Sequence, residues 1–349
     1  MNAQYGSYSR IAAVQDALRA AGFGEGPIPW EALAQLDQFH VGGLAATRQL
    51  ALRLAIVPRS RVLDVGSGLG GPSRFLAATY GCDVTGIDLT APFVEIAEML
   101  TQRTGLGDRV RSVVGDATDL PFDDGYFDIA WTQHVAMNIA DRAGLYAGVY
   151  RVLVPGGRFA MYDVISGDSG PIEYPVPWAS DVSVSYVTSA AEMRGALETA
   201  GFAIEVWEDT TQLALAWFAA PAPADAGHGA ALALPIVAGA DFPARAGNLA
   251  RNIREGPRAS RASCRDQTRI ARRSVNATTP KLNNRRHASI VPNSQRNRRR
   301  ARGSRDRYAA SDLASCCAWP LPRDSAKWAS IATLSIPCSE SSFCSARFS

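Results

Sequence analysis

The sequence predicts a doubly wound α/β fold, in which a mostly parallel sheet carries helices on both of its faces. Between residues 61 and 209, short apolar runs alternate with longer segments of helical periodicity, a pattern typical of parallel sheets. Acidic residues end three of the runs in succession, at the edge where such a sheet binds ligands. Hydrophobic residues make up 47% of the 349 residues, which allows a sizeable core.

Three helical segments are expected before the sheet. The first, 10–21, has apolar residues at helical spacing and is broken by the Gly- and Pro-rich string at 22–29. A second segment begins near Trp30, and a third runs from about Gly43 to residue 57, where Pro58 ends it. We therefore expect residues 1–57 to form an N-terminal helical cap.

The main domain, residues 58–256, supplies the strands and the helices that connect them. Its apolar runs predict strands at 61–66, 83–89, 109–117, 126–133, 158–165 and 203–209. Helical periodicity predicts helices at 71–81, 91–105, 141–153 and 189–202. Because crossovers between parallel strands are right-handed, the carboxyl ends of these strands should meet at one edge.

Charge divides the chain into two unlike parts. Residues 1–257 carry a formal charge of −11 and no lysine, whereas residues 258–349 carry 17 Arg and 2 Lys against 5 acids. An acidic domain is a poor partner for nucleic acid, so a small-molecule substrate is favoured. Cys82 is the single cysteine of the acidic part, and no signal peptide or membrane span is visible, so we expect a cytoplasmic protein.

A glycine-rich turn follows the first strand. Gly66, Gly68 and Gly71 satisfy G-x-G-x-x-G, which alone also fits nicotinamide and flavin enzymes. Asp88 ends the second strand, where a carboxylate can accept both hydroxyls of a ribose. Asp64 stands two residues before the turn, where it would repel a pyrophosphate but attract an ammonium group.

Together with Asp116 at the end of the third strand, these motifs resemble the class I S-adenosylmethionine-dependent methyltransferases. The acid-x-G-x-G-x-G pattern of that family is met by Asp64, Gly66, Gly68 and Gly70. The resemblance covers residues 30–255 and implies a Rossmann-like sheet of seven strands, the last antiparallel, with S-adenosyl-L-methionine as methyl donor. It implies the following donor-binding residues: Asp64, Gly66, Ser67, Gly68, Gly70, Asp88, Leu89, Asp116, Ala117 and Gln133.

The acceptor is expected beside the end of the fourth strand, in the string WTQHVAMNI at 131–139. His134 suits a general base, because its ordinary pKa of about 6.5 allows proton uptake near neutrality. Asn138, four residues on, would share a helical face with it. A structural role for His134 stays open, as does N-, O- or C-methylation.

Two further strings are candidates for the acceptor pocket. LDQFHVGG at 36–43 resembles a segment of the sarcosine/dimethylglycine, tocopherol and phosphoethanolamine methyltransferases that closes over the donor, so Phe39 and His40 would line the pocket. The same string also fits a Gly-Gly hinge. In the long segment 167–186, Tyr174 and Trp178 would wall an apolar or cationic acceptor, or else cover the sheet edge. No metal site is expected.

The chain after residue 256 departs from the resemblance. Where the family continues with its final antiparallel strand, the sequence becomes rich in Arg, Ser and Cys, as a shift in reading frame would make it. We therefore expect the final strand to be missing and residues 257–349 to be a disordered basic tail. Two alternative functions stay open: an NAD(P)-dependent oxidoreductase, and nucleic-acid binding through the Arg-rich stretch at 296–305.

Overall fold

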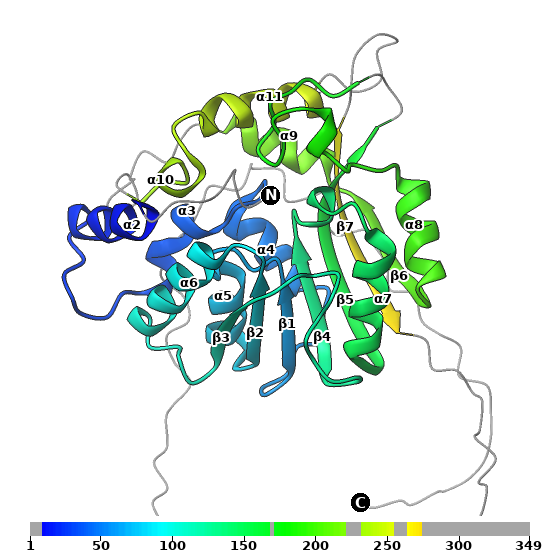
Figure 1. The fold of residues 1–349 in the computed structure, drawn as a ribbon, viewed down its shortest axis with the longest axis horizontal. Helices are drawn as coiled ribbons and strands as arrows, with labels where there is room; N and C mark the ends of the chain where they lie inside the picture. Colours follow the sequence, from blue (N-terminus) through cyan, green and yellow to red (C-terminus); the bar gives the residue numbers. More distant parts are fainter. Residues whose placement is uncertain (1–8, 168–170, 221–231, 255–263, 274–349) are drawn as a thin grey trace, which may run out of the picture. The chain divides into compact units, whose positions relative to one another are not determined.

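A seven-stranded sheet forms the centre of the protein. The computed structural model describes residues 9–167, 171–220, 232–254 and 264–273. Within them the strands are ordered β3-β2-β1-β4-β5-β7-β6, as they appear across Figure 1. Their bounds are β1 Arg61–Val65, β2 Asp83–Asp88, β3 Val110–Val114, β4 Phe127–Gln133, β5 Leu153–Ser166, β6 Phe202–Asp209 and β7 Cys264–Arg273. β1 to β5 pair in parallel, and β7 runs antiparallel to both of its neighbours.

The described helices include those that connect the strands and those that cap the sheet. They are α2 Ser9–Ala20, α3 Ala34–Asp37, α4 Gly43–Ala51, α5 Gly71–Tyr80, α6 Ala91–Arg103, α7 Arg142–Val152, α8 Ala190–Thr199, α9 Thr211–Ala219, α10 Pro235–Ala238 and α11 Phe242–Arg254. Three short 3₁₀ turns accompany them: Trp30–Leu33, Ala136–Asn138 and Val182–Val184. None of the described helices combines the length and the apolar character that crossing a membrane requires.

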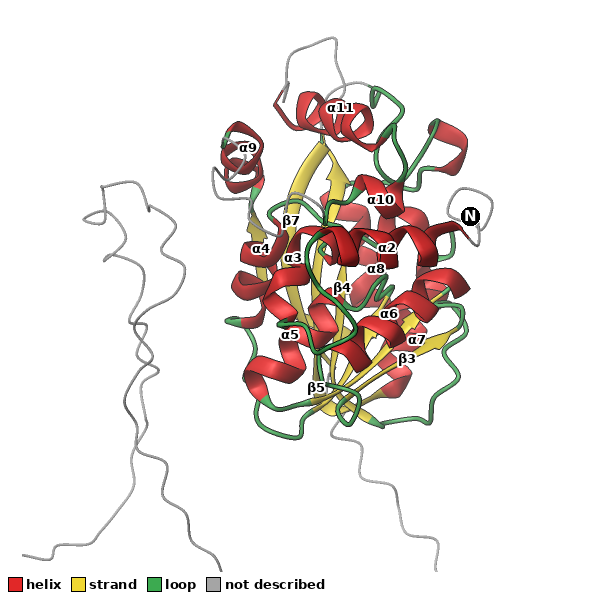
Figure 2. Cartoon of the chain, turned by 90° about the vertical axis from the view of Figure 1, so that its left-hand side faces the viewer, coloured by secondary structure: helices red, strands yellow, loops and turns green. Residues whose placement is uncertain are grey.

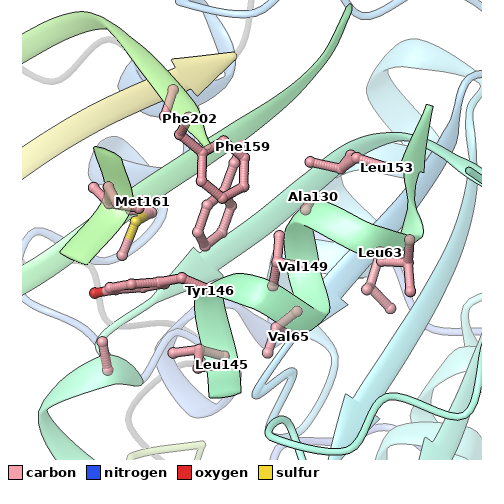
Figure 3. Packing of buried hydrophobic residues seen from close by; sticks show 14 of the residues in the cluster. Leu63, Val65, Ala130, Leu145, Tyr146, Val149, Leu153, Phe159, Met161 and Phe202 are labelled. Atoms are coloured by element: carbon pink, nitrogen blue, oxygen red, sulfur yellow. The ribbon is translucent and has the colours of Figure 1, made fainter. Parts of the chain in front are cut away.

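Hydrophobic side chains cover both faces of the sheet, because alternate residues of a strand point in opposite directions. On one face, α7 and α8 pack on Leu63, Phe159 and the strands beside them. Figure 3 shows Phe159 beside Phe202 of β6, and their ring centroids are 5.5 Å apart. On the other face, α4 and α5 pack on Val62, Trp131 and their neighbours. Burial on both faces explains why these strands read as short, nearly continuous apolar runs.

The predicted N-terminal cap is helical. The third segment, α4, ends at Ala51, several residues before the expected stop at Pro58. Buried residues of α2, α3 and α6 share one cluster with Leu69 of the glycine-rich turn. Figure 1 shows α11 above the carboxyl ends of the strands and α10 beside α2, and Figure 2 shows α11 there from the side. The cap and these helices therefore lie at the edge where sheets of this type bind ligands.

The expectation that the final antiparallel strand is missing is wrong, because Cys264–Arg273 forms β7 between β5 and β6. Its register pairs Ala160 with Ile270 and Ile204 with Ala271. The basic and polar residues of this segment do not form the apolar pattern by which a strand is predicted. A strand that pairs on both sides is nevertheless stabilised by backbone hydrogen bonds, whose donors and acceptors are present in almost every residue. The expectation of a disordered tail is thus wrong for 264–273, and the rest of 257–349 lies outside the described residues.

Two side chains at the end of β7 help to hold it in the sheet. Ala271 is 1% exposed and belongs to the same core cluster as Phe159. The Arg273 guanidinium lies 4.7 Å from the centre of the Tyr150 ring, which suits a cation–π contact. Arg273 also donates to the backbone oxygen of Leu153. The basic composition that argued against a strand thus supplies one of its contacts.

Candidate functional site

One cavity of about 390 Å³ lies at the carboxyl ends of β1 to β4. Its walls come from these strand ends, from the segment between α3 and α4, from the 136–141 turn, and from residues around Trp178 and Phe242. All predicted site residues except Gly70 and Tyr174 line it. The fold therefore brings together residues that are as far apart in sequence as Phe39 and Trp178.

The glycine-rich turn gives a ligand room to approach the backbone. Gly66, Gly68 and Gly70 have φ angles of 70°, 54° and 75°, a region that side chains disfavour. A Cβ at Gly66 would lie 2.4 Å from Val135 Cγ2, so this position is closed to larger residues. Gly70 does not line the cavity; it caps the start of α5, and its role is to turn the chain.

Asp64 is a buried carboxylate, 2% exposed, at the end of β1. Its Oδ2 accepts a hydrogen bond of 2.6 Å from Ser73 Oγ. Burial raises the pKa of Asp64 from 3.8 to about 7, the Ser73 bond opposes this rise, and the charge of Asp88 adds to it. A cationic group bound beside Asp64 would favour its charged form and lower that pKa.

Asp88 connects the second strand to the glycine-rich turn. Its Oδ2 accepts from the Gly68 amide at 2.9 Å and its Oδ1 from the Thr90 amide at 2.8 Å. Burial raises its pKa, and hydrogen bonds from these two amides and from the Thr90 side chain oppose the rise. A carboxylate has about four acceptor positions, so Asp88 can also accept from a ligand, such as a ribose hydroxyl.

Asp116, the third strand-end acid, lies at the exposed side of the cavity. Its Oδ1 accepts from the Thr118 amide at 2.8 Å and from Thr118 Oγ1 at 2.7 Å. These contacts fix the carboxylate while Oδ2 stays available to a ligand amine at the rim.

Gln133 ends β4 with its amide orientation fixed by a donor. Trp131 Nε1, which can only donate, lies 3.1 Å from Gln133 Oε1. Because Oε1 faces Trp131, Nε2 points away from it. Nε2 is buried and has no hydrogen-bond partner among the described residues. Ser67 Oγ is buried and unpartnered in the same sense. Buried polar groups are normally satisfied, so these two atoms fit a polar ligand in this cavity.

The turn after β4 holds His134 in an unusual conformation, with φ of 55°. Its amide donates to the Tyr162 oxygen at 2.7 Å, and its ring lies 5.2 Å from the Tyr162 ring. Asp163 Oδ1, buried on β5, accepts from the amides of Val135 and Ala136 at 2.9 and 3.2 Å. A backbone strained at this position and tied down by a buried acid is typical of a functional site.

Asn138 lies in the 3₁₀ turn after His134 and lines the cavity. Its Nδ2 is 3.3 Å from both the His134 and the Val135 oxygens, so the side chain closes the turn on itself. The segment is not the helix on whose face both residues were expected. Its backbone contacts leave Asn138 Oδ1 as the atom that can face a ligand.

His40 is held as a neutral imidazole. Its Nε2 lies 3.0 Å from the Gly43 oxygen, and because a carbonyl only accepts, Nε2 carries the proton. Burial and, to a lesser extent, electrostatic repulsion from His134 lower the pKa of His40 to about 3, and the hydrogen bond to the Gly43 oxygen opposes this shift. Phe39 packs edge-on against Phe93, at 5.7 Å between ring centres. Both residues line the cavity as expected.

Trp178 lines the cavity as predicted, but Tyr174 does not. Trp178 is 4% exposed, and its Nε1 donates to Ser185 Oγ at 3.0 Å. Tyr174 instead packs in a cluster with residues of α9 and α11, including Phe218 and Leu249. The expectation that Tyr174 walls the acceptor is therefore wrong: the 171–186 segment turns its ring toward the helices that cover the sheet edge.

Phe242 and Ala238 were missed by the sequence reasoning. They belong to α11 and α10 and line the cavity from above. Their only local signal was the apolar character of the segment around them, which did not stand out from the rest of the domain. In the described part of the chain, no group of three His, Cys, Asp or Glu side chains is placed to hold a metal ion.

Residues 63–161 match the family model of a methyltransferase domain. The chain is 32% identical over 194 residues to a sterol 24-C-methyltransferase of Eremothecium gossypii, which covers 52% of each protein. It is 35% identical over 122 residues to a glycine/sarcosine/dimethylglycine N-methyltransferase of Actinopolyspora halophila, which covers 35% of this chain and 22% of that protein. The chain thus spans about half, or less, of the length of these relatives.

Solved structures share the fold at low sequence identity. The cyclase SpnF matches with a TM-score of 0.55 and 23% identity, covering 77% of this chain and 95% of SpnF. A geranyl diphosphate C-methyltransferase from Streptomyces coelicolor A3(2), solved with S-adenosyl-L-homocysteine, matches with a TM-score of 0.52 and 18% identity. The match covers 77% of this chain and 99% of that protein. A Haemonchus contortus phosphoethanolamine N-methyltransferase matches with a TM-score of 0.51 and 20% identity, and the match covers 77% of this chain and 60% of that protein. The predicted Rossmann-like fold class is confirmed.

Proposed function

From the methyltransferase domain at residues 63–161, we propose that the chain transfers a methyl group from S-adenosyl-L-methionine to a small-molecule acceptor. The observation that carries this proposal is the meeting of three strand-end acids, Asp64, Asp88 and Asp116, around one glycine-rich cavity. The names of the relatives include uncharged acceptors, such as sterols, and charged ones, such as phosphoethanolamine.

The residues of the cavity fit the donor. Asp64 offers a buried carboxylate to a cationic group, and Asp88 offers acceptor oxygens to the ribose hydroxyls. Gln133 Nε2 is a buried donor in need of an acceptor, which a carboxylate supplies. Asp116 at the rim can accept from an adenine amine.

When bound, adenosylmethionine supplies a sulfonium methyl group that a lone pair of the acceptor takes by in-line displacement, leaving adenosylhomocysteine. The cavity walls hold the acceptor in line, which supplies much of the acceleration. His134 stands on the acceptor side, next to the strained turn, where it can take the proton that a hydroxyl acceptor loses. His40, with its low pKa, stays neutral at working pH and serves as a fixed wall.

The alternatives have weaker support. An oxidoreductase would bring a pyrophosphate to the turn beside Asp64, where like charge opposes it. The Arg-rich stretch at 296–305 lies outside the described residues. A cytoplasmic location is supported by Cys82, a buried free thiol in the domain.

Two experiments test the proposal. Calorimetry should show that the protein binds adenosylhomocysteine and does not bind NAD. The Gly66→Val substitution should abolish adenosylhomocysteine binding, because the new side chain would overlap Val135 and fill the turn. Binding of NAD alone, or normal affinity in a folded Gly66→Val variant, contradicts the proposal. Because SpnF shows that this fold also hosts a cyclase, the enzyme should then be incubated with a methyl-deuterated donor and a metabolite extract. Label in an extracted molecule supports transfer, and a bound but unconsumed donor opposes it.

A further inference from the structure

The charges around the cavity are all of one sign. The charged residues among its described lining are five aspartates, Asp37, Asp64, Asp88, Asp116 and Asp141, and no Lys or Arg is among them. Asp37 is neutralised by Arg74, at 2.8 Å and buried with it. The other four accept hydrogen bonds from neutral donors, namely backbone amides and hydroxyl groups of the described residues.

The arginine side chains next to the cavity lining bind oxygen atoms of the protein. Arg74 also donates to the Leu69 oxygen at 2.7 Å, which fixes it behind the glycine-rich turn. Arg245, one turn along α11 from Phe242, pairs with Asp241 at 2.7 Å. Arg142, next to Asp141 in the chain, donates to the backbone oxygen of Tyr186. The Arg74 guanidinium is thus held by two residues of the lining itself, Asp37 and Leu69, and those of Arg245 and Arg142 are held by residues outside it.

The helix end beside the acceptor is also closed to anions. The start of α7 would offer free amides and a positive dipole end. Asp141 caps it, and its Oδ1 accepts from the Gly144 amide at 2.8 Å. An anionic acceptor would therefore meet a carboxylate in the place where the helix could have bound it.

The acceptor side of the cavity, defined as the part lined by Phe39, His134, Met137, Asn138, Trp178 and Phe242, combines four apolar side chains with the two polar side chains of His134 and Asn138. Burying a phosphate or carboxylate there would cost its hydration without an opposite charge in return. A protonated amine buried on this side would also lose its hydration for little return, because Asp141 is exposed and the charge of a solvated carboxylate is screened.

On the basis of the proposed function, we infer that the methyl acceptor is an uncharged molecule with an apolar body, and that phosphate esters, carboxylates and ammonium compounds are poor ligands of this cavity. A hydroxyl or an electron-rich carbon is the reacting group that this side suits. Hydrogen bonds from the side chains of His134 and Asn138 orient it, while the aromatic walls hold the body by burial of apolar area.

The test uses three probes that share one body: 2-naphthalenemethanol, 2-naphthoate and 2-naphthylmethylamine. Calorimetry is done on the full chain saturated with adenosylhomocysteine. We expect the alcohol to bind at least tenfold more tightly than either ion. Equal or tighter binding of the carboxylate or the ammonium overturns the inference, and so does failure of the alcohol to bind below about 1 mM. Failure of adenosylhomocysteine itself to bind would instead contradict the proposed function.

A matched pair of variants locates the probes. Phe242→Arg places a cation in the cavity lining, and it should improve the affinity for 2-naphthoate at least threefold relative to the alcohol. Leu213→Arg places the same cation on the exposed face of α9, outside the lining, and should change neither affinity. Identical probe affinities in both folded variants would place the binding elsewhere and overturn the inference. The comparison of probes on the unchanged chain decides the matter even if Phe242→Arg does not fold.

Discussion

Replacing Asp64 by Asn should make the ligand-free protein more stable at alkaline pH. Asp64 is 2% exposed, and its Oδ2 accepts a hydrogen bond from Ser73 Oγ. An Asn side chain has nearly the same shape, and its Oδ1 can still accept from Ser73. What the change removes is a charge that must be buried whenever the carboxyl ionises. A buried charge without an ionic partner is costly, so its removal should stabilise the fold.

The magnitude follows from the pKa of Asp64, which burial raises from 3.8 to about 7. Because the folded protein holds this proton more tightly than the unfolded chain, the group's contribution to stability is complete below pH 3.8. It is lost as the pH rises through about 7. At 1.36 kcal/mol per pKa unit, the loss between pH 5 and pH 8 is roughly 2–3 kcal/mol. The variant lacks this loss.

The assay is urea unfolding of both proteins, without ligand, at pH 5 and pH 8. The difference in unfolding free energy between variant and wild type should grow by roughly 2–3 kcal/mol from the lower to the higher pH. Asp83→Asn is the control, because Asp83 is on the same sheet region, is 41% exposed and pairs with Arg109. Parallel pH dependence of wild type and Asp64→Asn would refute the reasoning. Weaker binding of adenosylhomocysteine by the more stable variant would show what the buried charge is for.

Three more outcomes are expected. Asp88→Ala should weaken adenosylhomocysteine binding at least tenfold in calorimetry, because two hydrogen bonds to a charged group are lost, roughly 1–3 kcal/mol; unchanged affinity, with Asp83→Ala as control, would contradict the ribose assignment. His134→Ala should lower the turnover of a labelled acceptor more than it lowers donor affinity, and an equal loss in both would argue against an acceptor-side role. Truncation after residue 280 should leave the melting temperature within a few degrees, whereas truncation after residue 256 should lower it sharply because β7 is lost; equal melting temperatures would show that β7 does not stabilise the sheet.

The central strands and the strand-end acids could be predicted from the sequence, because both follow from the pattern of neighbouring residues. Burial on two faces makes β1 and β4 read as apolar runs, and the chain direction in a parallel sheet brings Asp64 and Asp88 to one edge. That these acids line one cavity was predictable for the same reason; their roles toward a donor stay predictions.

The remainder depends on contacts between distant segments, which local patterns do not record. β7 is basic, and its place in the sheet follows from the edges that β5 and β6 offer it. Tyr174 turns to Phe218 because α9 and α11 lie there, and neither helix was predicted. Phe242 enters the cavity for the same reason.

The position of β7 between β5 and β6 determines when the sheet can be completed during translation. The strand between β5 and β6 is the last of the three to leave the ribosome, and 64 residues separate Asp209, the end of β6, from Arg273, the end of β7. At 5–20 residues per second, translation of that stretch takes roughly 3 to 13 seconds. During this time β5 and β6 each present an open edge to other nascent chains. Slower translation of the segment before β7 should therefore lower the yield of folded protein, and a chaperone that covers strand edges should restore it.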